Sequence, residues 1–317
     1  MKKIKLSIII CTLNSPKLIK RCLESILKQN FKDKYEILLV DGGSDQKTIN
    51  LIKNYTKNYS HIKMINNPKK LPEGAGKGKW LGFKKSKGEI FGIIDQDNEL
   101  IGENSLKNII KPFENKEIFG VACKLYLKDK DNLTNKAISL MGTDPFVAYR
   151  SLDYLINTNK LNLQENKDYS TLKLNVNNII ITGGNCFFYR RGPLKNIGGY
   201  IQDIDNLLAL VKKGYNKIAI PKQAFTHHQA IEGFLKFIKK KKSWGKEYSP
   251  KNREFSWMPK TKLERREFIL NLFRILSIFP MFIESWIMAY KKRKLETLFI
   301  PIMKLSTLLA YISGRIK

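Results

Sequence analysis

Two carboxylates separated by a single residue, Asp95 and Asp97, follow an apolar run that ends at Ile94. Two acidic side chains in one loop can share a hard divalent cation through their oxygens, and such an ion can also neutralise the charge of a departing phosphate. Surface turns often show the same Asp-x-Asp spacing without binding anything. The position directly after a strand-like run is what favours a cation site here.

A further acidic residue, Asp41, stands before Gly42 and Gly43 at the end of another apolar run. A carboxylate beside two glycines can accept a hydrogen bond from a flat ligand, because the backbone lets that ligand come close. A nucleobase N–H is a natural partner. Asp and Gly are also common where a strand ends in a turn, and this structural alternative remains open.

The elements that must position these acids alternate between strand-like and helix-like patterns. β-Branched and apolar runs predict strands, and apolar residues at helical spacing predict the helices between them. Ser15 and Pro16 are typical of the start of a helix. In order, the pattern predicts strand 6–10, helix 16–27, strand 35–40, helix 48–59, strand 62–65, helix 77–86 and strand 90–94. This alternation predicts an α/β fold with a parallel sheet, whose ligands bind beyond the carboxyl ends of the strands.

The second half of the chain is less regular. Residues 125–178 are rich in Asn and Lys around an island at 142–146, and no element can be assigned there from pattern alone. Regularity returns with a run at 179–182, a Gly-Gly-Asn turn at 183–185, an apolar run at 186–189, a helix at 205–213 and a strand at 217–220.

The 317-residue chain carries 58 Lys and Arg against 28 Asp and Glu, a formal net charge of +30. Such a surface attracts polyanions, and charge alone does not choose among nucleic acid, anionic lipid and phosphate-bearing substrates. The four cysteines are scattered, which argues against a disulfide framework or a zinc site. The basic N-terminus precedes only a short apolar strand, so we expect no signal peptide and a cytoplasmic main domain.

Two strongly apolar segments, 268–290 and 295–312, follow a tract after Ile231 in which basic and aromatic residues are interleaved. Arg274, Glu284 and Lys304 interrupt these segments, so neither is a clean membrane span. The first has polar residues near one helical face and apolar residues on the others, which suits a helix in the lipid head-group region. Two ordinary core helices are the alternative.

Taken together, the motifs resemble those of the family 2 glycosyltransferases of the GT-A fold. The resemblance covers residues 4 to about 245, and the conjunction of motifs is far more specific than any single one. The matching stretches are SIIICTLN, LIKRCLESILKQ, YEILLVDGGS, GKGKWLGFKKSKGEIFGIIDQDN, TGGNCFFYRRGPLKNIGGY and DIDNLLALVKKGYNKIAI. This resemblance implies a Rossmann-like, mostly parallel central sheet flanked by helices, here followed by C-terminal membrane-associated helices.

The resemblance also implies roles for individual residues. Asp203 falls where the family has its catalytic base, and Asp95 and Asp97 fall where it binds Mn²⁺ or Mg²⁺. His227, rather than the adjacent His228, is our candidate for a third metal ligand. The residues expected to bind the nucleotide and donor sugar are Thr12, Asn14, Asp41, Lys79, Asp95, Gly183, Gly184 and Asn185.

Three positions depart from the family pattern. Gln202 replaces the usual Glu before the base, Asp45 sits one place early, and Trp80 replaces a frequent Asn. The first could change the acceptor preference or the pKa of the base, and the other two leave the identity of the nucleotide open. The resemblance places the catalytic domain at 1–245, with a nucleotide-sugar-binding half at 1–120 and an acceptor half at 121–245. A basic, aromatic linker and apolar helices would follow at 246–317.

The sequence therefore predicts an inverting, metal-dependent transfer from a nucleotide-sugar donor to a glycan or lipid-linked hydroxyl acceptor. The expected location is the cytoplasmic face of a membrane with an anionic surface, and no nucleic acid is expected as a partner. Alternatives are a polyprenyl-phosphate acceptor, which needs no general base, a basic nucleic-acid-binding protein, and an inactive relative that holds a partner or membrane. The sugar, the nucleotide and the oligomeric state stay open.

Overall fold

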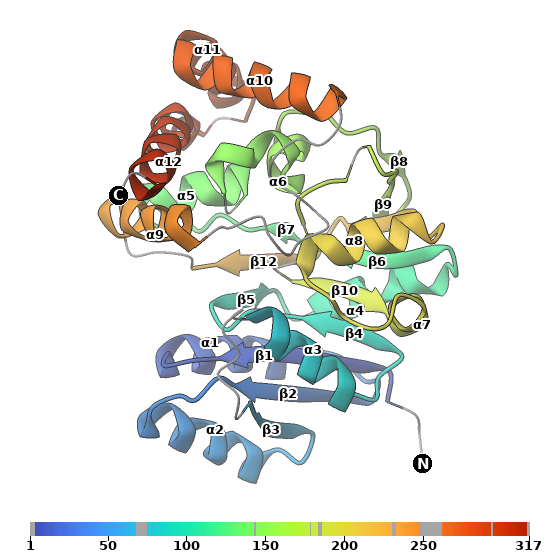
Figure 1. Ribbon diagram of the computed structural model, residues 1–317. Coiled ribbons are helices and arrows are strands. Elements are labelled where there is room, and N and C mark those ends of the chain that lie inside the picture. The colour runs from blue at the N-terminus through green and yellow to red at the C-terminus, as the bar shows by residue number, and fades with distance from the viewer. Residues whose placement is uncertain are drawn as a thin grey trace. The chain divides into compact units, whose positions relative to one another are not determined.

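A computed structural model of the chain describes residues 4–67, 75–142, 144–177, 179–182, 186–229, 233–247, 262–292 and 294–315. Contacts divide the chain into two compact units, the first made of Met1–Lys124 and Asn162–His227, the second of Leu125–Leu161 and His228–Lys317. Figure 1 shows the elements of both. The catalytic domain expected at residues 1–245 is a functional division and stays a prediction.

The first unit is built on a large sheet with helices packed on it. Its strands are β1 (Leu6–Thr12), β2 (Tyr35–Asp41), β3 (Ile62–Asn66), β4 (Ile90–Ile93), β5 (Asn98–Ile101), β6 (Ile118–Ala122), β8 (Gln164–Glu165), β9 (Tyr169–Lys173), β10 (Phe187–Arg190) and β11 (Lys217–Pro221), with β7 (Lys124–Leu125) and β12 (Phe225–His228) ending at the unit boundary. Its helices are α1 (Pro16–Leu27), α2 (Gln46–Asn58), α3 (Ala75–Lys85), α4 (Ser105–Ile110), the 3₁₀ helix η1 (Lys111–Glu114), α7 (Arg191–Asn196) and α8 (Asp203–Lys212).

Nine of these strands form the large sheet, in the order β3-β2-β1-β4-β10-β6-β11-β9-β8, and the other three form a second sheet, in the order β5-β12-β7. β1 runs parallel to β2 and to β4, with Thr12 opposite Asp41, so the loops after β1, β2 and β4 emerge at one edge. The α/β fold with a mostly parallel sheet is confirmed in this half. β10 is antiparallel to both of its neighbours, β4 and β6, which the local pattern does not reveal.

Both faces of β1 are buried, because helices cover the sheet on its two sides. Leu6, Ile8 and Ile10 belong to one hydrophobic cluster with residues of α1 and α2. Ile9 and Cys11 face the opposite way, toward α3. Burial on both faces explains why the strand reads as a continuous apolar run instead of an alternating one.

The segment that gave no assignment from sequence forms α5 (Leu133–Met141), η2 (Pro145–Arg150) and α6 (Leu152–Asn157) before β8 and β9. α5 is buried on nearly every side, so it lacks the apolar stripe by which a surface helix is recognised. Its start is marked by Asn132, whose side chain accepts from the Asn135 N–H. The unassigned island is held by Asp144, which caps η2 and pairs with Lys241 at 3.4 Å.

The second unit contains these helices together with α9 (Phe234–Glu247), α10 (Lys262–Ser277), α11 (Phe279–Lys292), η4 (Leu295–Phe299) and α12 (Ile300–Arg315). The apolar segment 268–290 was expected to form one amphipathic helix, and this expectation is wrong. The chain breaks at Ile278, whose φ is 60°, and the two helices meet at 88°. Part of the basic and aromatic tract, residues 248–261, lies outside the described residues.

Candidate active site

Asp41, at the end of β2, uses its carboxylate to close the turn that follows. Its Oδ2 accepts from the backbone N–H groups of Gly43 at 2.8 Å and Ser44 at 2.9 Å. Its Oδ1 accepts from the Ser44 hydroxyl at 2.5 Å and from the Thr12 hydroxyl at 3.1 Å. These four bonds occupy about as many lone pairs as a carboxylate offers. Asp41 therefore shapes the turn, and the N–H group of a bound nucleobase would have to share a carboxylate oxygen with these donors.

The loop after β1 is tied to this turn through Asn14. Asn14 has a φ of 44°, a backbone region that Asn tolerates better than most residues. Its side-chain oxygen accepts from the Asp45 N–H at 2.7 Å, and its own N–H donates to the Ser44 hydroxyl at 3.1 Å. Asp45 in turn caps α2 by accepting from the Thr48 N–H at 2.8 Å. The early Asp45 thus serves as a helix cap.

Lys79, on α3, lies between two acidic residues that are far apart in sequence. Its Nζ is 3.2 Å from Oδ1 of Asp95 and 3.1 Å from Oδ1 of Asp203, and its side chain is 4% exposed. Asp95 follows β4 and Asp203 begins α8. The structure therefore brings together the candidate metal ligand and the candidate base around one ammonium group.

Lys79 reaches these acids because α3 lies very close to β1. A Cβ atom added at Gly78 would be 2.9 Å from the Cys11 sulfur, and one at Gly82 would be 2.5 Å from a methyl carbon of Ile9. Both distances are too short for a side chain. The two glycines, one turn apart on α3, permit the close approach that carries the Lys79 ammonium to the end of the sheet.

The charges at this centre perturb one another. Burial raises the pKa of Asp95 to about 6; Lys79 opposes this rise, and the carboxylates of Asp97 and Asp203 add to it. Burial by itself lowers the pKa of Lys79, but Asp203 and Asp95 more than reverse this and hold that pKa above its ordinary value. The Lys79 ammonium contacts two carboxylates, and a third, that of Asp97, acts on Asp95, so negative charge exceeds positive charge among these four groups, and a cation would relieve the excess.

Two buried tyrosines hold Asp203. The Tyr200 hydroxyl donates to Oδ1 of Asp203, and the Tyr189 hydroxyl donates to the Asp203 backbone oxygen at 3.5 Å. Burial raises the pKa of both tyrosines above the ordinary value, so they remain donors at neutral pH. Lys79 also binds Oδ1, which leaves Oδ2 as the oxygen able to meet a ligand. The Asp203 side chain is 36% exposed, so water and substrates can reach it.

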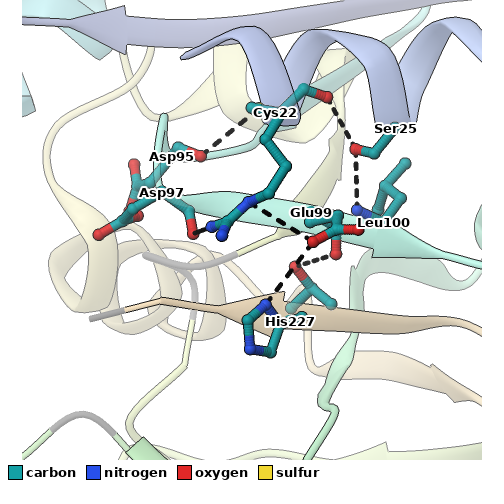
Figure 2. A network of polar contacts seen from close by, with 9 residues as sticks. Cys22, Ser25, Asp95, Asp97, Glu99, Leu100 and His227 are labelled. Carbon is teal, nitrogen blue, oxygen red and sulfur yellow. Dashed lines mark hydrogen bonds and ion pairs between the residues drawn. The ribbon is translucent and has the colours of Figure 1, made fainter. Parts of the chain in front are cut away.

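The loop of Asp95 and Asp97 is braced by the inner face of α1 (Figure 2). The Cys22 thiol donates to the Asp95 backbone oxygen at 3.7 Å. Ser25 donates to the Cys22 carbonyl at 2.7 Å and accepts from the Leu100 N–H at 3.0 Å. These contacts fix the backbone of the acidic loop between α1 and β5.

His227, on β12, is buried and faces Glu99 rather than the two aspartates. Its Nδ1 is 3.7 Å from Oε2 of Glu99, and Arg21 lies 3.5 Å from the same oxygen while donating to the Asp97 backbone oxygen at 3.3 Å (Figure 2). Among the described residues, no three His, Cys, Asp or Glu side chains surround a common point at which a metal could bind. A role for His227 as a third ligand stays a prediction.

The donor set nevertheless fits a hard divalent cation. Asp95 and Asp97 supply carboxylate oxygens, and the Asp95 side chain is 28% exposed, so an ion can reach it. The cations that suit such oxygens often complete their shell with waters and substrate phosphates instead of further side chains. Two acids are therefore sufficient as the protein's contribution.

Sequence reasoning missed several partners of the acids. Tyr200 lies three residues before Asp203, but nothing in an isolated Gly-Gly-Tyr stretch shows that its hydroxyl points at a carboxylate. Arg21, which donates to the Asp97 backbone oxygen, was missed for the same reason. Conversely, Gly183, Gly184 and Asn185, which were expected beside the donor sugar, lie outside the described residues.

Comparison with known proteins links this geometry to a family. The sequence profile described as "Glycosyl transferase family 2" matches residues 7–198. A dolichyl N-acetyl-α-D-glucosaminyl phosphate 3-β-D-2,3-diacetamido-2,3-dideoxy-β-D-glucuronosyltransferase of Methanococcus voltae is 26% identical over 253 residues, which is 76% of this chain and 71% of that protein. The GalNAc(5)-diNAcBac-PP-undecaprenol β-1,3-glucosyltransferase of Campylobacter jejuni is 33% identical over 97 residues, 31% of each chain.

Solved structures agree on the fold. The mannosyltransferase PcManGT of Pyrobaculum calidifontis, in complex with GDP-Man and Mn²⁺, superposes with a TM-score of 0.59 at 14% identity, covering 99% of this chain and 88% of that one. Residues 1–349 of S. aureus TarS, in complex with UDP-GlcNAc, superpose with a TM-score of 0.54 at 16% identity, covering 98% and 92%. At these identities the likeness shows the fold alone.

Proposed function

Because this chain belongs to glycosyl transferase family 2, and is thus a glycosyltransferase that acts on nucleotide sugars, we propose that it transfers its sugar to a hydroxyl acceptor with inversion, using Asp203 as the general base. The observation that carries the proposal is the Lys79 ammonium, which contacts Asp95 and Asp203 together. It supports a single centre in which leaving-group charge and acceptor deprotonation are handled side by side.

In the proposed reaction the acceptor oxygen attacks the anomeric carbon as the bond from that carbon to the diphosphate oxygen breaks. Asp203 takes the acceptor proton on Oδ2, because Tyr200 and Lys79 already bind Oδ1. Those two donors orient the carboxylate so that Oδ2 is the oxygen available to the acceptor. Attack from the side opposite the diphosphate inverts the anomeric centre.

Asp95 and Asp97 would hold Mn²⁺ or Mg²⁺, which neutralises charge on the departing nucleoside diphosphate when bound. Lys79 adds a fixed positive charge beside Asp95. His227 is proposed as a further ligand through Nε2, because its Nδ1 faces Glu99. Thr12, Asn14 and Asp41 would line the nucleoside pocket, and the turn at 183–185 would border the donor sugar and acceptor.

A panel of nucleoside diphosphates and their sugars tests the donor. UDP, GDP, ADP and CDP, each with and without Mn²⁺, should separate because a ligand that binds the folded state at 100 times its Kd adds about 2.7 kcal/mol to the free energy of unfolding. We expect one base to stabilise the protein, and Mn²⁺ to increase that effect. Asp95→Asn should lose the Mn²⁺-dependent part of the thermal shift. No stabilisation by any nucleotide would contradict the proposal.

The acceptor is proposed to be a glycan or a lipid-linked saccharide at the cytoplasmic face of a membrane, and the surface of the second unit supports this. On α10 and α11 most of the large apolar side chains face outward while Asn271 and Ser285 are buried. The exposed set is Ile269, Leu270, Phe273, Leu276, Phe279, Phe282, Ile283, Trp286, Ile287 and Tyr290. Apolar surface on this scale suits a lipid interface better than water.

The helices of the second unit are proposed to lie in the membrane surface instead of crossing it. One described helical stretch, Leu295–Arg315, is long and apolar enough to cross a membrane, and α10 with α11 would qualify together but for their 88° bend. Lys304, inside the first stretch, is buried against Tyr154, with Nζ 3.2 Å from the hydroxyl. This contact packs α12 against α6, so the position of α12 is set by protein contacts and not by lipid alone.

A double variant tests the membrane contact. Phe273 and Trp286 are 66% and 68% exposed, so replacing both by Glu should leave packing intact while removing apolar area and adding negative charge. We expect binding to vesicles of phosphatidylglycerol and phosphatidylcholine to fall at least tenfold, since burying one such side chain is worth about 1.5–3 kcal/mol. Vesicle flotation measures this. Leu133→Glu, at an exposed position on α5, is the matched control, and equal binding by all proteins would refute the interface.

A further inference from the structure

The residue between the two metal-loop acids, Gln96, clamps the backbone of the neighbouring loop. Its side-chain oxygen accepts from the Leu13 N–H at 2.9 Å, and its side-chain amide donates to the Leu13 carbonyl at 3.2 Å. A carboxamide can make both bonds at once, because it carries an acceptor and a donor. The backbone of Leu13 is thus bound as an adjacent strand would bind it, although the residue as a whole is 51% exposed.

The two loops meet because their strands are neighbours. β4 pairs with β1 in parallel up to Ile93 opposite Ile9, and the Ile94 N–H continues the ladder by donating to the Ile9 carbonyl at 3.1 Å. The pairing of the two strands ends here, and the next connection between the two chain segments is made by the Gln96 side chain. The other side of the β1 loop is held by Asn14, which binds Ser44 and Asp45. The loop of Thr12–Asn14 therefore has one anchor on each side.

We propose that Gln96 is a positioning residue that couples cation binding at Asp95 and Asp97 to the shape of the nucleoside loop at Thr12–Asn14. The inference rests on the proposed function, which places the cation and the nucleoside at these two loops. A cation drawn between the acids shifts the residue that joins them, and Gln96 transmits the shift to the Leu13 backbone. The two binding events then share a coupling free energy, which is reciprocal.

The coupling predicts a behaviour that contact alone does not give. A nucleoside without phosphates lacks the groups through which a donor would reach a metal ion at Asp95 and Asp97, so we expect an effect of Mn²⁺ on its affinity to pass through the protein. In the wild type we expect Mn²⁺ to change the affinity for uridine or guanosine about fivefold, the low end of ordinary coupling between sites. In Gln96→Ala the affinity should be the same with and without Mn²⁺, while both carboxylates still bind the ion.

Hydrogen exchange of the full-length protein provides a second readout that needs no nucleoside. Loss of the Gln96 acceptor should speed exchange of the Leu13 N–H about fivefold in the metal-free protein, because this amide would then be bound to water alone. Mn²⁺ should alter that exchange in the wild type and leave it unchanged in the variant. Gln46→Ala, which removes an exposed glutamine bonded to Asn50 on its own helix, is the control and should match the wild type.

The outcomes separate the coupling from the proposed function. Unchanged Leu13 exchange in Gln96→Ala, or the same Mn²⁺ effect on nucleoside affinity as in the wild type, would overturn the coupling even if the enzyme is fully active. Mn²⁺ that fails to bind the wild type at all, measured by calorimetry, would instead remove the metal from the proposed function. The metal-free exchange comparison would still decide whether Gln96 anchors the loop.

Discussion

Replacing Asp203 by Asn is expected to lower the rate of sugar transfer by about 10²- to 10⁴-fold, the usual contribution of a general base. Asn keeps the shape of the side chain and can still accept from Tyr200, but it cannot take a proton from the acceptor. Lys79 keeps its contact with Asp95, so the affinity for the nucleoside diphosphate should change little. Steady-state transfer rates and calorimetric titration of the nucleotide measure the two quantities separately.

Tyr200→Phe is the graded control for this variant. It removes the hydroxyl that binds Oδ1 of Asp203 but keeps the carboxylate, so the loss of rate should be about tenfold at most. A normal rate in Asp203→Asn would show that the base is assigned wrongly. If the transfer rate of Asp203→Asn were normal with a polyprenyl phosphate as the acceptor and absent with a saccharide hydroxyl, the acceptor would be the phosphate, whose oxygen needs no deprotonation.

Replacing Lys79 by Met is expected to destabilise the protein by about 2 kcal/mol and to make it depend on a divalent cation. Removing one partner of a fully buried pair costs about 3–5 kcal/mol. The cost should be lower here, because water reaches both Asp95 and Asp203. Without the ammonium, the clustered carboxylates should bind Mn²⁺ about tenfold more tightly. Chemical denaturation with and without Mn²⁺ measures both effects.

Lys84→Met is the matched control, since Lys84 lies on the same helix and its ammonium rests over the ring of Trp80 at 5.4 Å. It should change neither the stability nor its response to Mn²⁺. Wild-type stability in Lys79→Met, or a response to Mn²⁺ no larger than that of the wild type, would show that the ammonium is not the counter-ion of this centre. Activity should fall in the variant, because a fixed charge beside Asp95 is lost.

The sequence predicts the first half of the fold well because its signals are local. Apolar runs, polar strand ends and a Ser-Pro helix start are all visible within a few residues, and β1 to β4 lie where these patterns place them. The antiparallel direction of β10, in contrast, has no local signal in the sequence. An antiparallel strand between two others has the same apolar run as a parallel one, so its pairing depends on residues far away in the chain.

The site was predictable only in part, for a related reason. Asp95 and Asp203 could be identified from motifs, and in the structure both contact the ammonium of Lys79. The resemblance placed Lys79 among the residues that bind the nucleotide, near the nucleobase or the phosphates, but no pattern in the sequence shows that it bridges two acids. Gln96 occupies the unspecified position of the Asp-x-Asp motif, so the motif predicts no role for it. Its two hydrogen bonds are to the backbone of Leu13, in the loop after β1. Partners of this kind are set by tertiary contacts.

The close approach of α3 to β1 has a consequence for how such chains are recognised. The Lys79 side chain is of fixed length, so its ammonium reaches the acids only while Gly78 and Gly82 leave no methyl group against Cys11 and Ile9. A descendant with alanine at either position would retain every acid, base and hydroxyl discussed here. A search for charged motifs would still find it, yet we expect the added methyl group to push α3 and β1 apart and move the Lys79 ammonium away from the two acids. We therefore expect the activity of a related enzyme to require glycine at the positions of Gly78 and Gly82 as well as the residues that carry out the chemistry.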